Sequence, residues 1–162
     1  MKHILPLLAL LLFAQAPAPA LAQQAARFTY SADGQEVTDQ ATGLIWRRCA
    51  EGMAWASSTC TGSALNFTHE NALTRAKTEA TASGKAWRLP NVKELSSLVD
   101  RSRCYPAIDV AAFPATPSSW FWSSSPYAGG SYSAWLVSFY NCYVSYNFRF
   151  NGNAVRLVRA SQ

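Results

Sequence analysis

The side chains best suited to covalent chemistry in this sequence are four cysteines, and their placement favours a structural role. Cys49 and Cys60 flank a short stretch rich in Gly, Ser and Thr, so we expect a disulfide that closes this loop. In the chain-entropy description, closing a ring of this size contributes on the order of 3 kcal/mol. Cys104 and Cys142 remain, and they could form a second disulfide or stay free.

We expect no metal, no cofactor and no catalytic residues. There is no Cys-x-x-Cys pair, and His69 is the only histidine after position 22, whereas zinc sites combine several Cys or His ligands. The nucleophile motif Gly-x-Ser-x-Gly is also absent. Cys104 with Cys142 is the only candidate for a redox-active pair, and no flanking motif supports it.

Segment 118–153 has the composition of a binding surface. It contains nine Ser, five Tyr, four Asn and three Gly, and no Asp, Glu or Lys. Tyr and Trp supply rigid contact area at low entropy cost, while Ser, Asn and Gly adapt their hydrogen bonds. A sandwich core with its aromatic rings inside would have a similar composition. Within 136–150, however, the alternate positions that should face solvent carry Tyr, Phe, Asn and Ser instead of charges, which favours a contact surface.

We therefore predict a ligand-binding surface between positions 136 and 153. The candidate residues are Leu136, Ser138, Tyr140, Asn141, Tyr143, Ser145, Tyr146, Asn147, Phe148, Arg149, Phe150, Asn151 and Asn153. Arg149 could hold an anionic group through bidentate hydrogen bonds. Arg156 is a weaker candidate, because pairing within the scaffold is the preferred interpretation for it and for Arg159. Calcium is not expected, since Asp109 is the last acidic residue and calcium sites usually include carboxylates.

The patterns that flank this segment predict an α+β domain. A strand pair is expected at 28–30 and 35–37 around Asp33-Gly34, and a third strand at 42–46. Thr68 can cap a helix over 69–82 that ends near Gly84. The remaining predicted strands are 120–123, 134–139, 143–150 and 154–158.

A second helix is expected to begin after Asn91, because Glu94 three residues later completes a capping box. Its buried stripe would be Leu95, Leu98 and Val99. Its last turn would then run toward Arg101, close to the negative end of the helix dipole. Strands followed by helices and then by more strands define the α+β class.

Residues 1–22 are predicted to be a cleaved secretion signal, and residues 23–162 a single domain. A basic start, about ten apolar residues and an Ala-Leu-Ala ending fit a signal peptide and are too short for a membrane helix. The protein is then expected to be exported to the periplasm, the cell surface or the medium, without stable membrane insertion. Its charged content of only 14% argues against disorder and against nucleic-acid binding.

Five motifs in order resemble the Lcl C-terminal domain family, the C-terminal domain of a bacterial collagen-like adhesin that was formerly a domain of unknown function. The motifs are Thr42-Gly43-Leu44-Ile45-Trp46, Trp87-Arg88-Leu89-Pro90-Asn91 with its continuation to Asp100, Pro106-Ala107-Ile108-Asp109 with Phe113-Pro114, Trp122-Ser123-Ser124-Ser125-Pro126, and Val155-Arg156-Leu157-Val158-Arg159. The resemblance implies a C-type-lectin-like fold, related to formylglycine-generating enzymes. It also implies an adhesive or ligand-binding role, associated in the adhesin with sulfated glycosaminoglycans.

Some members of this family are targets of diversity-generating retroelements, which mutate adenines near the 3′ end of a gene. The resemblance therefore gives the hypothesis that the surface is diversified, with Trp135, Val137, Phe139, Arg149 and Val155 as the fixed scaffold. The varied positions would be Cys142, Gly152 and all of the candidate ligand-binding residues named above except Arg149. Under this hypothesis a structural disulfide at Cys142 is disfavoured.

Three functions remain open from the sequence. The first is an exported binding module for an unidentified protein or glycan, with an anionic ligand as one candidate. The second is an oxidase of the formylglycine-generating type that uses Cys104 and Cys142. The third is a structural envelope protein without a specific ligand. The oligomeric state is left open.

Overall fold

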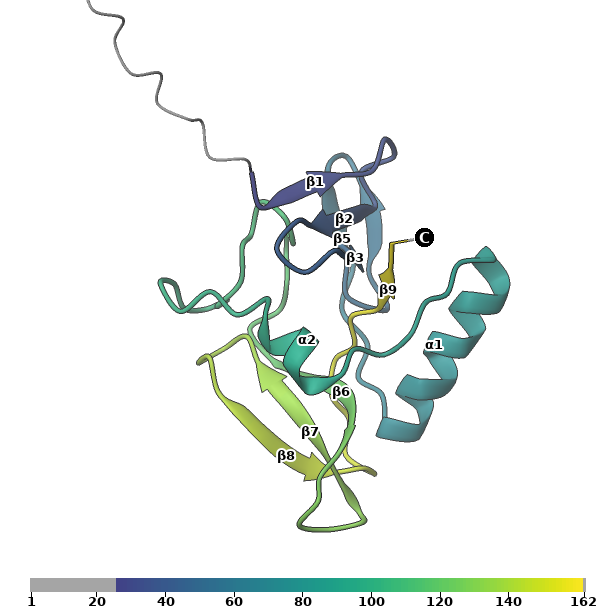
Figure 1. The fold of residues 1–162 in the computed structure, drawn as a ribbon, viewed down its shortest axis with the longest axis vertical. Helices are drawn as coiled ribbons and strands as arrows, with labels where there is room; N and C mark the ends of the chain where they lie inside the picture. The colour runs from purple at the N-terminus through teal and green to yellow at the C-terminus, as the bar shows by residue number, and fades with distance from the viewer. Residues whose placement is uncertain (1–25, 162) are drawn as a thin grey trace, which may run out of the picture.

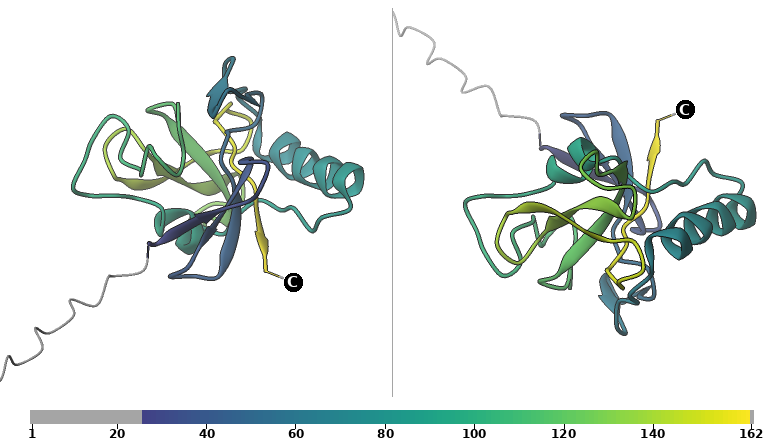
Figure 2. Two further views of the ribbon diagram at one scale, coloured as in Figure 1. Left: turned by 90° about the horizontal axis from the view of Figure 1, so that it is seen from above. Right: turned by 90° about the horizontal axis from the view of Figure 1, so that it is seen from below.

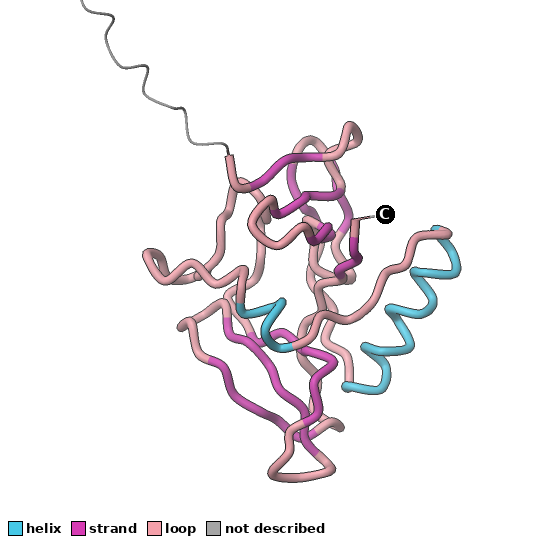
Figure 3. Tube along the Cα trace, in the orientation of Figure 1, coloured by secondary structure: helices cyan, strands magenta, loops and turns pink. Residues whose placement is uncertain are grey.

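The computed structural model describes residues 26–161, and the predicted signal at 1–22 lies outside this range. The described residues form two main antiparallel sheets and a small two-stranded one, with two helices beside the main sheets, as Figures 1 and 3 show, which confirms the α+β class. The first sheet has the order β1-β2-β3-β9 and joins the two ends of the domain. Its strands are β1 (Phe28–Tyr30), β2 (Glu36–Asp39), β3 (Leu44–Arg47) and β9 (Val158–Ala160).

The second sheet carries the candidate surface. Its order is β6-β7-β8, with strands β6 (Trp120–Pro126), β7 (Ser133–Ser138) and β8 (Val144–Phe148). Helix α1 (His69–Ser83) lies beside this sheet and α2 (Val92–Ser96) lies between the two sheets, as the views in Figure 2 also show. The C-terminal segment 153–157 runs from this sheet back to the first one (Figure 1), so the predicted strand at 154–158 is mostly a buried connection.

Two hydrophobic clusters fix the second sheet. Trp46, Phe113, Phe121 and Phe139 belong to the cluster between the two sheets. A second cluster lies beneath α1, where Trp122 of β6 packs with the small alanines of the helix. Both faces of the central strand β7 are therefore covered, and this sheet is held rigidly.

Both helices begin where the sequence predicted. Thr68 caps α1, and Gly84 ends it in the left-handed conformation at φ 66°. Asn91 and Glu94 form the expected capping box at α2.

The predicted length of the second helix is wrong, because α2 ends at Ser96 and Arg101 lies beyond it. The N–H of Asp100, which in a continued helix would donate to the carbonyl of Ser96, instead donates to the carbonyl of Ala107 at 3.0 Å. The Ser97 hydroxyl also donates to the carbonyl of Glu94 at 2.7 Å, a local bond that competes with continued helix. The carbonyl of Ser97, just beyond the helix, accepts the guanidinium of Arg27 at 2.7 Å.

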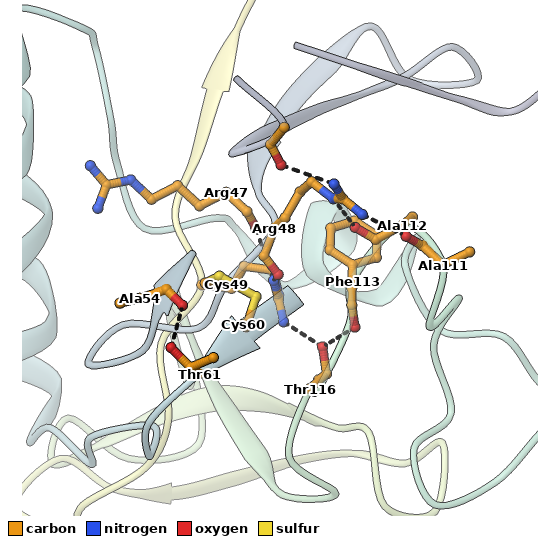
Figure 4. The surroundings of a disulfide bond; sticks show 12 residues. Arg47, Arg48, Cys49, Ala54, Cys60, Thr61, Ala111, Ala112, Phe113 and Thr116 are labelled. Atoms are coloured by element: carbon orange, nitrogen blue, oxygen red, sulfur yellow. Dashed lines mark hydrogen bonds between the residues drawn. A yellow bond between two sulfur atoms is a disulfide. The ribbon is translucent and has the colours of Figure 1, made fainter. Parts of the chain in front are cut away.

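The disulfide between Cys49 and Cys60 is present, with Cα atoms 5.5 Å apart. The stretch that it closes was predicted as a loop and contains a small hairpin, β4 (Ala54–Ala56) and β5 (Thr59–Thr61). Figure 4 shows the neighbouring Arg48, whose guanidinium donates to the carbonyls of Ala111 and Ala112 at 2.7 and 2.8 Å. This arginine ties the disulfide region to the loop before β6.

Candidate ligand-binding surface

The tyrosine and phenylalanine side chains of the predicted surface point to solvent. Tyr143 is 66% exposed and Phe150 is 72% exposed, and Tyr140, Tyr146 and Phe148 are each about half exposed. The alternation of β8 explains this pattern, because Val144, Tyr146 and Phe148 share one side of the strand. The outward orientation that distinguishes a contact surface from a sandwich core is therefore observed.

The exposed rings are already ordered against one another. Tyr127 and Tyr146 stack with their centroids 3.9 Å apart and an interplanar angle of 8°. Trp135 meets Tyr127 edge to face at 5.0 Å, and Phe148 stacks on Phe150 at 5.3 Å. Such packed rings have little conformational freedom left to lose when a ligand binds.

Three of the candidate residues are buried, which corrects their predicted place on the surface. Leu136 lies in the central strand β7 and packs into the cluster beneath α1. The hydroxyl of Ser138 accepts the backbone N–H groups of the following turn at 3.2 and 3.3 Å. Asn153 exchanges two backbone hydrogen bonds with Phe67, at 2.9 and 3.0 Å. All three residues are therefore held inside the scaffold and not on its surface.

The remaining polar candidates are half buried and shape the turns between the rings. Asn147 is the clearest case, because its side-chain oxygen accepts the N–H of Phe148 at 2.9 Å and the amide of Asn151 at 2.7 Å. Asn141 acts similarly toward Tyr143 at 3.4 Å. The other half-buried candidates are Ser145 and Arg149.

The sequence reasoning missed four aromatic residues of this surface. Tyr127 and Trp135 form the stack with Tyr146, Tyr132 is largely exposed, and Tyr105 packs against Tyr140 at 4.5 Å between centroids. Tyr127 and Tyr132 lie inside the Tyr-rich segment, so composition contained that signal. Tyr105 had none, because only the folded chain brings it beside Tyr140.

Arg149 lines a hollow of about 510 Å³ between β8 and the first turn of α1. Its Nε donates to the carbonyl of Ser133 at 3.2 Å, and none of the acidic groups within residues 26–161 forms a salt bridge with it. Tyr132 and Phe150 form the aromatic part of the wall. Burial, with Arg149 nearby, holds the pKa of His69 below its ordinary value, so that this imidazole is neutral near pH 7. Arg149 is then the positive charge of this hollow, and the carboxylate of Glu70 is its negative charge.

The other arginines of the C-terminal third serve the scaffold, as the sequence favoured. Arg156 is fully buried and donates to the carbonyls of Arg47 and Arg48 and, at 2.7 Å, to the hydroxyl of Thr116. Burial lowers its pKa to about 9. Arg159 pairs with Glu36 at 2.6 Å.

A second hollow of about 510 Å³ lies between α1 and the disulfide region and differs in its charges. Arg47, Glu51, Arg75 and Glu79 form a closed ring of four ion pairs there, with distances between 2.6 and 3.2 Å. Each of these four charges is neutralised by two neighbours, so the ring itself offers no free charge comparable to Arg149.

Cys104 and Cys142 are free thiols, so the second disulfide that the sequence left open is not formed. Cys104 is exposed, and the Sγ atom of Cys142 lies 3.9 Å from the carbonyl oxygen of Arg103. Nowhere in the described part of the chain do three His, Cys, Asp or Glu side chains gather as a metal centre would require. Over the same residues, no helix has the length and apolar character needed to cross a bilayer.

The structure thus defines a disulfide-bonded α+β domain with an uncharged aromatic surface. A family model described as the Lcl C-terminal domain matches residues 35–159, so this chain belongs to the Lcl C-terminal domain family. Searches of curated proteins found no match, and searches of solved structures found none either. Family membership suggests an adhesin-like domain, and the disulfide is consistent with export.

Proposed function

We propose that this protein is an exported binding or adhesion module, and not an enzyme, whose ligand docks on the aromatic surface of β8 and its flanking turns. The supporting observation is that the rings of Tyr140, Tyr143, Tyr146, Phe148 and Phe150 project to solvent from a rigid sheet. Exposed apolar groups gathered on one face mark interaction sites. Because the rings are already stacked, less side-chain conformational entropy is lost when a ligand binds.

The scaffold proposed for this surface is the C-type-lectin-like fold that family membership implies. The sheet in which β9 pairs with β3, close to β1, supports it, because the two ends of the domain are held together there. The β6-β7-β8 sheet, which carries the aromatic surface, then extends away from the β1-β2-β3-β9 sheet.

The ligand proposed is a glycan or a protein that carries an anionic group. Arg149 supports this, since its guanidinium borders a hollow of about 510 Å³ without an acidic partner in the described chain. Binding is proposed to be independent of calcium, because positions 110–162 contain no carboxylate side chain.

We also propose that retroelement diversification, where it acts on this gene, is concentrated at the exposed positions. The burial of Leu136, Ser138 and Asn153 supports this narrower set, since variation there would disturb the core. The gene itself tests this: adenine-derived substitutions should cluster in the codons of exposed residues, with a near-identical template copy and a reverse transcriptase gene nearby. A gene that lacks these features would contradict it.

The function is tested by binding of the purified domain to arrays of glycans and of surface proteins, with and without a chelator. Tyr146→Ala should weaken binding by about 2 kcal/mol, roughly thirtyfold, as central aromatic contacts do. Tyr30→Ala is the matched control, because Tyr30 is 51% exposed and Tyr146 is 50% exposed, but Tyr30 lies on the other sheet.

Four outcomes would contradict this proposal. Equal losses in the two variants would refute the location of the surface. Binding that the chelator abolishes would refute calcium independence. Oxidation of a peptide thiol that depends on Cys104 or Cys142 would favour an oxidase, and the absence of any ligand would favour a purely structural role.

A further inference from the structure

Among residues 26–161, no strand lies beside one edge of the β6-β7-β8 sheet. β8 pairs only with β7, and Figure 1 shows it as the outermost strand of the sheet. The opposite edge is covered, because Trp122 of β6 donates its backbone N–H to the carbonyl of Ala154 at 2.9 Å. Edge strands usually carry charges or proline that prevent association, and β8 contains neither.

The hydrogen bonds to β7 show which backbone groups of β8 point outward. The carbonyl of Tyr143 accepts from Ser138 at 2.8 Å, and the N–H of Arg149 donates to the residue just before β7 at 2.8 Å. Because antiparallel bonding alternates along a strand, the odd-numbered residues between these two also face β7. The N–H and C=O groups of Val144 and Tyr146 therefore face the open edge.

Phe148, the next residue in this alternation, has its backbone groups occupied locally. Its N–H donates to the side chain of Asn147 at 2.9 Å, and its carbonyl accepts the N–H of Asn151 at 3.0 Å. The open edge therefore offers four backbone groups, two on Val144 and two on Tyr146.

We propose that β8 pairs with β8 of a second copy of this chain, antiparallel, about a two-fold axis at Ser145. In this register Val144 of each copy lies opposite Tyr146 of the other and exchanges both backbone bonds with it. All four free groups of each copy are then used. A register centred on Tyr146 would instead place the occupied groups of Phe148 opposite Val144.

The side chains fit this self-pairing. Val144 meets the Tyr146 ring of the other copy on one face, and Tyr143 meets Asn147 on the opposite face. Ser145 meets its own counterpart at the close, non-hydrogen-bonded position, where a small hydroxyl fits and Cα atoms lie about 4.5 Å apart. No pair brings like charges together, and aromatic pairs with β-branched residues are favourable across strands.

Pairing about a two-fold axis uses the open edge of both copies, so association stops at the dimer. A single strand pair with its bordering rings is a small interface, so self-association should be weak and visible only at high protein concentration. The inference does not depend on the proposed ligand, because backbone groups provide the pairing.

Crosslinking tests the register in a Cys104→Ser, Cys142→Ser background. Ser145→Cys should form a disulfide-linked dimer under mild oxidation, because its Cα separation of about 4.5 Å lies within the range that a disulfide spans. Asn147→Cys is the control, since it is also half buried and on the same side of β8. The offset of four residues separates its two copies by about 13 Å along the strands, too far for a disulfide. Equal crosslinking at the two positions would overturn the register.

Sedimentation experiments over a range of concentrations test the dimer itself. The mass of the wild-type protein should rise toward twice that of the monomer and no further. Val144→Pro removes an outward N–H without removing a bond to β7, and it should abolish the rise, whereas Val144→Thr should retain it. A wild-type protein that stays monomeric, or that grows beyond a dimer, would overturn the proposal.

Discussion

The disulfide between Cys49 and Cys60 gives a stability prediction whose size follows from the structure. The two residues are separated by 11 positions, so opening the bond releases a loop of that length in the unfolded chain. The chain-entropy relation gives about 2.8 kcal/mol for such a loop at 25 °C. Globular proteins have a nearly constant unfolding entropy per residue. For a domain of residues 26–161, a loss of about 2.8 kcal/mol therefore lowers the Tm by about 10 °C.

The assay is urea denaturation of the 26–161 domain, followed by tryptophan fluorescence, with oxidised and reduced wild-type protein and Cys49→Ala/Cys60→Ala. Alanine is the substitution of choice because Cys60 is buried, where a serine hydroxyl would need a partner. We expect the reduced wild-type protein and the double variant to be destabilised by similar amounts. Their m-values should rise slightly, because the unlinked unfolded chain exposes more surface.

Reductant added to the double variant provides the critical control. It should change nothing, because Cys104 and Cys142 are free thiols in the structure. A further destabilisation would reveal a disulfide between these two residues and contradict their free state. A loss below about 1 kcal/mol on opening Cys49–Cys60 would refute the entropic reasoning, because the estimated contribution would then be absent.

Three further predictions concern the scaffold. Asn91→Ala should lower the free energy of unfolding by about 1 kcal/mol, measured in urea, because the capping box at α2 is lost. The stability should fall as the pH is lowered from 6.5 toward 5, since burial depresses the pKa of His69 and the unfolded chain then binds more protons than the folded one. For one titrating group, the free energy of unfolding changes by at most about 1.4 kcal/mol per pH unit. His69→Gln should reduce this pH dependence, and an unchanged pH dependence would show that another group causes it. Phe139→Ala should lower the free energy of unfolding, measured by calorimetry, by about 3–5 kcal/mol, because Phe139 is fully buried. Phe150→Ala should change it by no more than about 0.5 kcal/mol, because Phe150 is exposed. Similar losses in the two variants would contradict the burial of Phe139.

Features set by neighbouring residues could be predicted from the sequence. Thr68, Asn91 and Gly84 act within a few residues of the helix ends that they define, and the structure places those ends as expected. The disulfide was predictable for the same reason, because Cys49 and Cys60 flank one short loop. Local chemistry therefore predicted the helix starts and this crosslink.

Features decided by distant contacts could not be predicted. The second helix does not continue because the N–H of Asp100 donates to the carbonyl of Ala107 instead of Ser96, and no local pattern indicates that contact. Leu136 and Ser138 were placed on the surface because alternation assigns one face of a strand to solvent. In β7 both faces are covered, so alternation gave the wrong result for these two residues.

The contrast between β7 and β8 also explains how one sheet can combine a rigid scaffold with a changeable surface. β7 is central and buried, so each side chain there is constrained by packing on both faces. β8 lies at the edge, where Tyr146 contacts the half-buried rings of Tyr127 and Trp135 and Phe148 contacts the exposed ring of Phe150. A substitution on β8 changes the contact surface at little cost to the core, while backbone bonds to β7 keep its position. The pairing of a buried strand with an exposed neighbour thus lets one sheet combine a fixed scaffold with an exposed aromatic surface.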